Sequence, residues 1–192
     1  MFQRINIVKI FKRHFNTFYD YSELQFTGKH KTLFRDKLVF IVFPMALSLI
    51  LVSLNIFFIE FYISVILTCL ALFIGLLFNF LTLIYQIINK IKSDSLDSSD
   101  HKTEARFILS KELFVNVSFA IALSIFCVLA ILITQFRPPL LIHLIRFKPY
   151  FYLIKMAYCY STSFIAYFLI IEFVLTLLMI LKRFFVIFEK EF

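Results

Sequence analysis

Long apolar runs alternate with short polar segments along the chain. Four runs reach about 20 residues, the length that an α-helix needs to cross the hydrocarbon core of a bilayer. They cover residues 38–59, 61–88, 113–134 and 157–181. The pattern predicts an all-α integral membrane protein whose single transmembrane domain, residues 38–181, contains four membrane-spanning helices.

Composition agrees with this prediction and narrows the chemistry. Hydrophobic residues make up 61% of the 192 residues, a share too high for a soluble domain of this size. Cys69, Cys127 and Cys159 lie in or beside apolar runs without CxxC spacing, so we interpret them as packing residues. The Asp94, Asp97, Asp100 series lacks the central glycine of a calcium loop. No metal or cofactor is therefore predicted.

Lys and Arg are distributed unevenly between the two sides of the predicted helices. The N-terminal segment 1–37, the loop 90–112 and the tail 182–192 hold 16 of the 20, and segment 135–156 holds the other 4. The positive-inside rule then places both termini and loop 90–112 in the cytoplasm and segment 135–156 outside. The net charge of +8 is assigned to contact with lipid headgroups and not to direct nucleic-acid binding.

The N-terminal segment has its own pattern. Apolar residues recur at helical spacing through the first 19 residues, which predicts a basic amphipathic helix. The basic side chains predicted to contact either the inner leaflet or a cytoplasmic partner are Arg4, Lys9, Lys12 and Arg13. Both uses need the same helix face, so the sequence leaves both open.

Polar and small residues also form stripes inside the apolar runs. The second run carries them at intervals of three, four or seven, which is one face of a helix: Ser64, Thr68, Gly75, Asn79, Thr82 and Gln86. The third run has a weaker stripe: Asn116, Ala120, Ser124 and Cys127. The first run has Pro44, Ser48 and Asn55. Because polar side chains avoid lipid, these faces are predicted to point inward, as interhelical contacts or, if several copies assemble, as a pore lining.

The fourth run contains one carboxyl group, that of Glu172. It precedes Lys182 by 10 residues, which places it about 15 Å from the boundary and near the middle of the bilayer, where the neutral acid is favoured. The partner predicted for it is Asn79 at similar depth. Thr176, one turn further on, is predicted to extend this contact toward Thr82. With Gln86, these residues form the predicted intramembrane polar site, either interhelical contacts or a gate.

The sequence shows no catalytic pattern. It has no HExxH motif, no paired carboxylates and no Ser/His/Asp or Cys/His arrangement. Its two glycines, Gly28 and Gly75, exclude a glycine-rich phosphate loop. We therefore expect a protein that is not an enzyme.

Two stretches carry a resemblance to a known class of proteins. They are residues 34–87, FRDKLVFIVFPMALSLILVSLNIFFIEFYISVILTCLALFIGLLFNFLTLIYQI, and residues 177–188, LLMILKRFFVIF. The most distinctive part, LFIGLLFNFLTLIYQI, contains Gly75 and Asn79. The chain resembles small four-span bacterial membrane proteins encoded beside anti-phage defence genes, which serve as membrane sensors or as effectors that disturb the membrane.

The resemblance implies a non-enzymatic, homo-oligomeric membrane subunit of a defence system, a sensor or pore-forming effector coupled to a cytoplasmic defence protein. The alternative is a small housekeeping transporter or channel that uses Glu172 as its ion or proton site. Weak similarity between the first and second halves of the chain argues against an inverted-repeat transporter.

The orientation can be tested with reporter fusions. A cytoplasmic reporter fused after Ser98 should be active and a periplasmic one silent, because the Lys and Arg asymmetry retains this loop inside the cell. A fusion within segment 135–156 should give the opposite result. Periplasmic activity after Ser98 would contradict the predicted topology.

Overall fold

The computed structural model describes residues 7–16, 34–54, 60–94, 101–135 and 148–189, and all of these except Leu54 are helical. In chain order they are α1 (Ile7–Asn16), α3 (Phe34–Ser53), α4 (Glu60–Asp94), α5 (His101–Gln135) and α7 (Lys148–Glu189). The all-α class predicted from the sequence is therefore confirmed for the described part of the chain.

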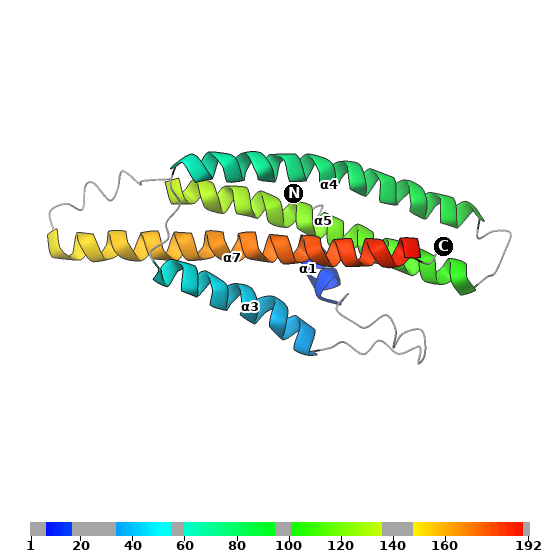
Figure 1. Ribbon diagram of the computed structural model, residues 1–192, viewed down its shortest axis with the longest axis horizontal. Helices are drawn as coiled ribbons and strands as arrows, with labels where there is room; N and C mark the ends of the chain where they lie inside the picture. The colour runs from blue at the N-terminus through cyan, green and yellow to red at the C-terminus, as the bar shows by residue number, and fades with distance from the viewer. Residues whose placement is uncertain (1–6, 17–33, 55–59, 95–100, 136–147, 190–192) are drawn as a thin grey trace.

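Helices α4, α5 and α7 run lengthwise beside one another and form an elongated bundle (Figure 1). Helix α5 packs against both α4 and α7 and also receives α1, whereas α3 packs along α7. Helices α4 and α5 are antiparallel, as are α5 and α7 (Figure 1). Helix α5 is therefore the element through which most of the bundle is joined.

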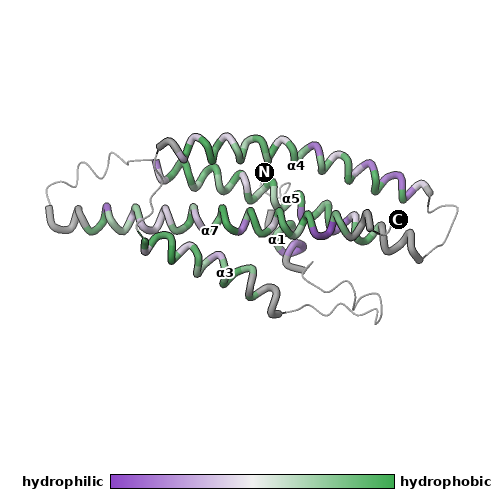
Figure 2. The backbone as a smooth tube through the Cα atoms, in the orientation of Figure 1, coloured by the Kyte–Doolittle hydropathy of each residue, from purple (hydrophilic) through white to green (hydrophobic). Residues whose placement is uncertain are grey.

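Three helices are long and apolar enough to cross a membrane. Their apolar stretches are Tyr62–Ser93, Phe107–Gln135 and Leu153–Phe185, at the second, third and fourth predicted spans. Figure 2 shows hydrophobic residues along most of their length. In α3 the apolar stretch is the shorter Phe40–Ser53. The first predicted span, 38–59, ends in residues that lie outside the described part, and it stays a prediction.

Helix boundaries differ from those predicted. Helix α4 continues to Asp94 and α5 begins at His101, so both helices extend into segment 90–112, which the sequence predicted as a loop. Helix α7 begins at Lys148, inside the predicted external segment. Pro149 stands in its first turn, where a missing backbone N–H leaves no hydrogen bond unmade. Apolar run length therefore underestimated the helices, because charged residues such as Lys and Glu extend a helix well into water.

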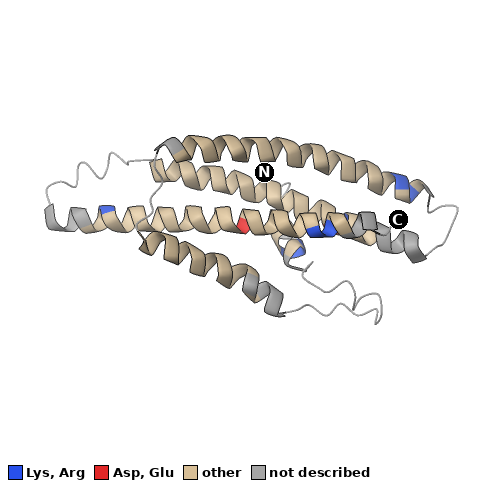
Figure 3. Ribbon diagram, in the orientation of Figure 1, with Lys and Arg blue, Asp and Glu red and all other residues tan. Residues whose placement is uncertain are grey.

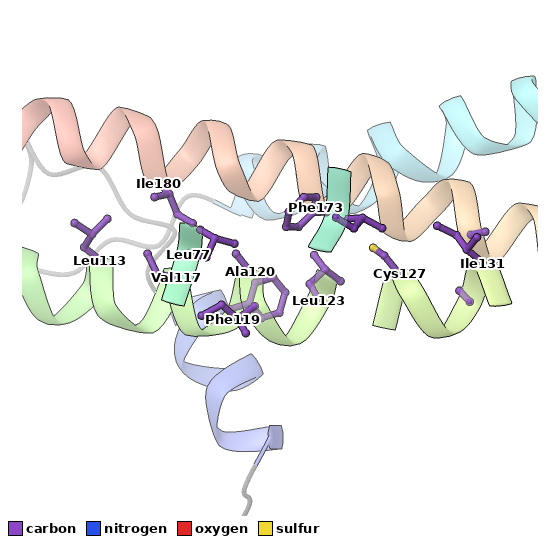
Figure 4. Packing of buried hydrophobic residues seen from close by; sticks show 14 of the residues in the cluster. Leu77, Leu113, Val117, Phe119, Ala120, Leu123, Cys127, Ile131, Phe173 and Ile180 are labelled. Carbon is purple, nitrogen blue, oxygen red and sulfur yellow. The ribbon is translucent and has the colours of Figure 1, made fainter. Parts of the chain in front are cut away.

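Part of the core consists of buried residues that recur every seven positions along α4, α5 and α7, and Figure 4 shows several of the buried residues. Helix α4 buries Ile63, Leu70, Leu77 and Ile84; α5 buries Leu113, Ala120 and Cys127; α7 buries Ala166, Phe173 and Ile180. Sevenfold spacing keeps one seam of each helix against its neighbour and is typical of left-handed, nearly parallel helix packing. Aromatic contacts join α4 to α7, with the rings of Phe80 and Phe184 5.1 Å apart.

The close packing of α7 can be tested at its small buried residue. Ala166 has no exposed surface, so Ala166→Leu should strain the seam by about 1–3 kcal/mol and lower the melting temperature in detergent. The matched control is Ala157→Leu, at an exposed position of the same helix. Circular dichroism against temperature gives both values, and equal melting temperatures would contradict this packing.

Candidate functional site

An apolar groove lies between α3, α5 and α7. It has a volume of about 550 Å³. Its walls include Ile41 of α3 and Phe11 of α1. Helix α5 contributes Phe119, Leu123, Phe126, Leu129, Ala130 and Ile133, and α7 contributes Thr162, Ile165, Phe168, Leu169 and Glu172. Helix α4 contributes none of these residues, so the groove belongs to the side of the bundle where α3 lies.

Glu172 is the acidic residue of this groove, and its carboxyl group has an unmet hydrogen bond. The side chain is 5% exposed, and its Oε2 atom has no hydrogen-bond partner among the described residues. The other polar side chain in the lining, Thr162, donates its hydroxyl to the backbone carbonyl of Tyr158 at 2.8 Å. The groove therefore combines apolar walls with one carboxyl oxygen that still needs a donor.

Figure 3 shows how isolated this carboxyl is: α7 is uncharged over a long stretch on either side of its acidic residue. In the sequence, Glu172 is the single Asp, Glu, Lys or Arg between Lys155 and Lys182. The prediction that Glu172 points into the bundle is confirmed by its burial, whereas its depth in a membrane stays a prediction. The role predicted for it, as contact or gate, stays a prediction.

The predicted partners of Glu172 are not brought to it. Asn79, Thr82 and Gln86 of α4 are exposed, and so are Ser64, Thr68 and Gly75. The prediction that the polar face of the second run points inward is therefore wrong within one chain. Large aliphatic residues fill the α4–α5 seam instead. The hydroxyls of Thr68 and Thr82 donate to backbone carbonyls one turn earlier, at 2.8 and 3.1 Å, so they need no inward partner.

The hydroxyl of Thr176 also bonds the backbone of its own helix. Its side chain is fully buried and one turn from Glu172, as predicted, but its hydroxyl donates to the backbone carbonyl of Glu172 at 2.8 Å. Because the hydroxyl of Thr82 also bonds its own helix, the predicted contact between Thr176 and Thr82 does not form.

The stripe predicted for the third run does point inward. Asn116, Ala120, Ser124 and Cys127 are all fully buried in α5, and in α3 Pro44 and Ser48 are buried as well. Ser48 donates its hydroxyl to the carbonyl of Pro44 at 2.6 Å. The inward orientation expected for these residues is confirmed, while Asn55 of the first run lies outside the described residues.

A polar cluster joins α1, α5 and α7 beyond the groove. Arg183 of α7 forms an ion pair with Glu112 of α5 at 3.0 Å, and one turn along α5 Asn116 bonds His14 Nδ1 of α1 at 2.9 Å. The imidazole of His14 stacks on Phe119 with ring centroids 3.8 Å apart. Sequence reasoning missed His14, Glu112 and Arg183. For Glu112 the available signal was its spacing of four residues from Asn116 at the start of the third apolar run, whereas no such signal marked His14.

The basic residues predicted to meet a membrane or partner are divided by the structure. Lys12 and Arg13 are exposed on α1, while Phe11 and His14 of the same helix pack against α5. The side chain of Lys9 and the whole of Arg4 lie outside the described residues. Among the side chains that are described, no group of three His, Cys, Asp or Glu is placed to hold a metal ion.

The described part of the chain is all-helical, with three helices long and apolar enough to cross a membrane and an apolar groove that contains one carboxyl group. No protein-family model matches the chain, and neither a curated protein nor a solved structure matches it.

The docking of α1 should depend on pH. Burial lowers the pKa of His14 from 6.5 to about 4, opposed by its hydrogen bond to Asn116 and aided by the charge of Arg183. The docked imidazole is therefore neutral, while an undocked one takes up a proton near 6.5. Protonation favours the undocked form, so docking is complete above pH about 6.5 and weakens as pH falls toward 4.

Spin labels can measure this change. With the exposed Cys69 and Cys159 replaced by Ser, labels at Lys12→Cys and Lys111→Cys should give a narrow distance distribution at pH 7.5 that broadens at pH about 5. His14→Phe keeps the ring stack and removes the titrating group, so its distribution should not change with pH. Identical pH responses in the two proteins would show that His14 is not responsible.

Proposed function

We propose that this chain is a non-enzymatic membrane subunit that works as a homo-oligomer in a bacterial inner membrane with both termini in the cytoplasm. In this proposal it acts as a membrane sensor or membrane-disturbing effector of anti-phage defence, coupled to a cytoplasmic protein. Its resemblance to defence-associated membrane proteins supports the biological role. One structural observation supports the oligomer: the polar stripe on the outside of α4.

Asn79 is the costly residue in this stripe. Its side chain is exposed on an apolar helix, 11 residues before Lys90, and has no hydrogen bond among the described residues. An amide group left unpaired in hydrocarbon costs several kcal/mol by water-to-alkane transfer, roughly 4–8 kcal/mol at the upper limit. Unlike a threonine hydroxyl, it is not bonded to its own helix here. A second helix would satisfy it.

Gly75, one turn earlier on the same face, points to the same conclusion independently. A Cβ atom added there would meet nothing within 4 Å, so no contact with the described residues requires glycine. Glycine in a helix interior is about 1 kcal/mol less favourable than alanine. In membranes, small residues at such positions allow two helix backbones to approach closely.

A second copy of the chain is the occupant that fits this face. An asparagine side chain carries both donors and an acceptor, so two copies of Asn79 related by a twofold axis can bond each other. More copies would bring further stripe residues, such as Ser64, Thr68 and Gln86, around a shared axis. That arrangement would supply the polar lining that a membrane-permeabilising effector needs.

Helix α1 supplies the proposed link to the cytoplasm. Lys12 and Arg13 are exposed while the opposite face of α1 is held against α5. Their positive charge suits an acidic surface of a partner or the anionic inner leaflet. A partner that engages them would act directly on the helix that also contacts the groove through Phe11.

Disulfide crosslinking tests the oligomer. In a chain with Cys69→Ser and Cys159→Ser, Gly75→Cys should form disulfide-linked dimers in native membranes, because the α4 faces meet there. The matched control is Leu76→Cys, which is 63% exposed on a different face of α4 and should remain monomeric. Adding Asn79→Leu to Gly75→Cys should reduce the crosslinked fraction about fivefold, from the roughly 1 kcal/mol of an interhelical polar contact.

The same variant tests the function. Cells that express the chain with its neighbouring genes should resist phage, and Asn79→Leu should lose that resistance while the protein still reaches the membrane. Crosslinking at Leu76→Cys as strong as at Gly75→Cys would refute this interface. Full resistance with Asn79→Leu would refute its role in function.

A transporter or channel is the second candidate function, favoured by the unpaired carboxyl oxygen of Glu172 at a groove between helices. Buried carboxyl groups within membrane spans commonly mark ion or proton pathways. Gene neighbourhood separates the two functions: nucleases or nucleotide-signalling enzymes favour defence, and a metabolic operon favours transport.

A further inference from the structure

We infer that the groove between α3, α5 and α7 binds a lipophilic cation, a molecule whose positive charge is enclosed by apolar groups, with that charge beside Glu172. The site lies within one chain and uses no residue of α4. It therefore does not depend on the proposed oligomer.

The first argument is the carboxyl group. The side chain of Glu172 is 5% exposed and lines the groove. Its Oε2 atom has no hydrogen-bond partner among the described residues. The backbone of α7 satisfies Thr162 and Thr176 at 2.8 Å each, and nothing similar satisfies this oxygen. A cation suits this carboxyl group because it can take the place of the proton of the neutral acid: the proton leaves to water as the cation binds, and the ion pair compensates the charge that hydrocarbon disfavours.

The second argument is the aromatic lining. Phe11, Phe119, Phe126 and Phe168 come from three different helices and all line the same groove. The faces of aromatic rings attract cations, and they do so more strongly where water is excluded. Phe119 is held in place by Phe11, whose ring lies edge-on at 4.8 Å, and by the stacked imidazole of His14. The aromatic rings and the carboxyl group are thus both suited to a positively charged ligand.

The third argument is size and depth. A volume of about 550 Å³ lies within the roughly 300–1,000 Å³ of sites for compact small molecules. A phospholipid would place its charged headgroup at the interface, about 15 Å from the depth expected for Glu172. Its acyl chain could fill apolar walls but offers nothing to a carboxyl. A compact cation with apolar substituents satisfies walls, rings and carboxyl together.

Two ions of nearly equal size and opposite charge provide the test. Equilibrium dialysis of the full chain in nanodiscs should show saturable binding of tetraphenylphosphonium, about tenfold tighter than binding of tetraphenylborate. Glu172→Gln should weaken tetraphenylphosphonium binding about tenfold and leave tetraphenylborate unchanged. Phe126→Leu, at a position 38% exposed, should weaken tetraphenylphosphonium binding by a smaller factor.

The matched control is Glu112→Gln, which removes a carboxylate outside the groove and should leave both affinities unchanged. Equal binding of the two ions, non-saturable partitioning into lipid alone, or unchanged affinity in Glu172→Gln would each overturn the inference. If Glu172→Gln does not assemble, the comparison of the two ions on the unmodified chain decides alone. Crosslinking at Gly75→Cys is unaffected by any of these results, so this site and the proposed oligomer can fail separately.

Discussion

A side chain in the hydrocarbon core of a membrane has no water to bond, so the protein itself must supply every hydrogen bond. In this chain that constraint divides the polar residues into two groups. Hydroxyl groups solve it locally: Ser48, Thr68, Thr82 and Thr176 each donate to a carbonyl four residues earlier in their own helix. Amide and carboxyl groups do not. The two places with functional interest, Asn79 and Glu172, are both of the second kind.

The arrangement of the helices follows from how α5 is packed. Its small and polar face is fully buried, and its seams receive α4 on one side and α7 on the other. Helix α3 makes its contacts chiefly with α7, through a face that contains Pro44 and Ser48. Helices α3 and α5 both pack against α7 but make few contacts with each other. Apolar space therefore remains between them. The groove thus results from the way in which α3 and α5 pack on α7, and Glu172 is one of the α7 residues that line it.

The sequence predicted the elements better than their orientation. Run length found the three long helices, and periodicity found the buried face of α5 from Asn116 to Cys127. The same periodicity gave a wrong orientation for α4. A stripe of polar residues shows that one helix face differs from the others, but it does not show whether that face points into the bundle or away from it. Local hydroxyl bonds remove most of the expected penalty for facing outward. His14 could not be predicted, since its burial depends on a contact with Asn116, 102 residues away.

The self-bonded hydroxyls of α4 also bear on how the protein is made. A helix whose threonines are already bonded to its own backbone can rest in lipid as a lone segment soon after insertion. Asn79 is different, because its amide gains a partner only when another helix arrives. Under the proposed oligomerisation, newly inserted chains would associate by diffusion in the membrane, and the fraction assembled would rise with the number of chains per cell. Abundance would then act as the switch between a dispersed and an assembled population.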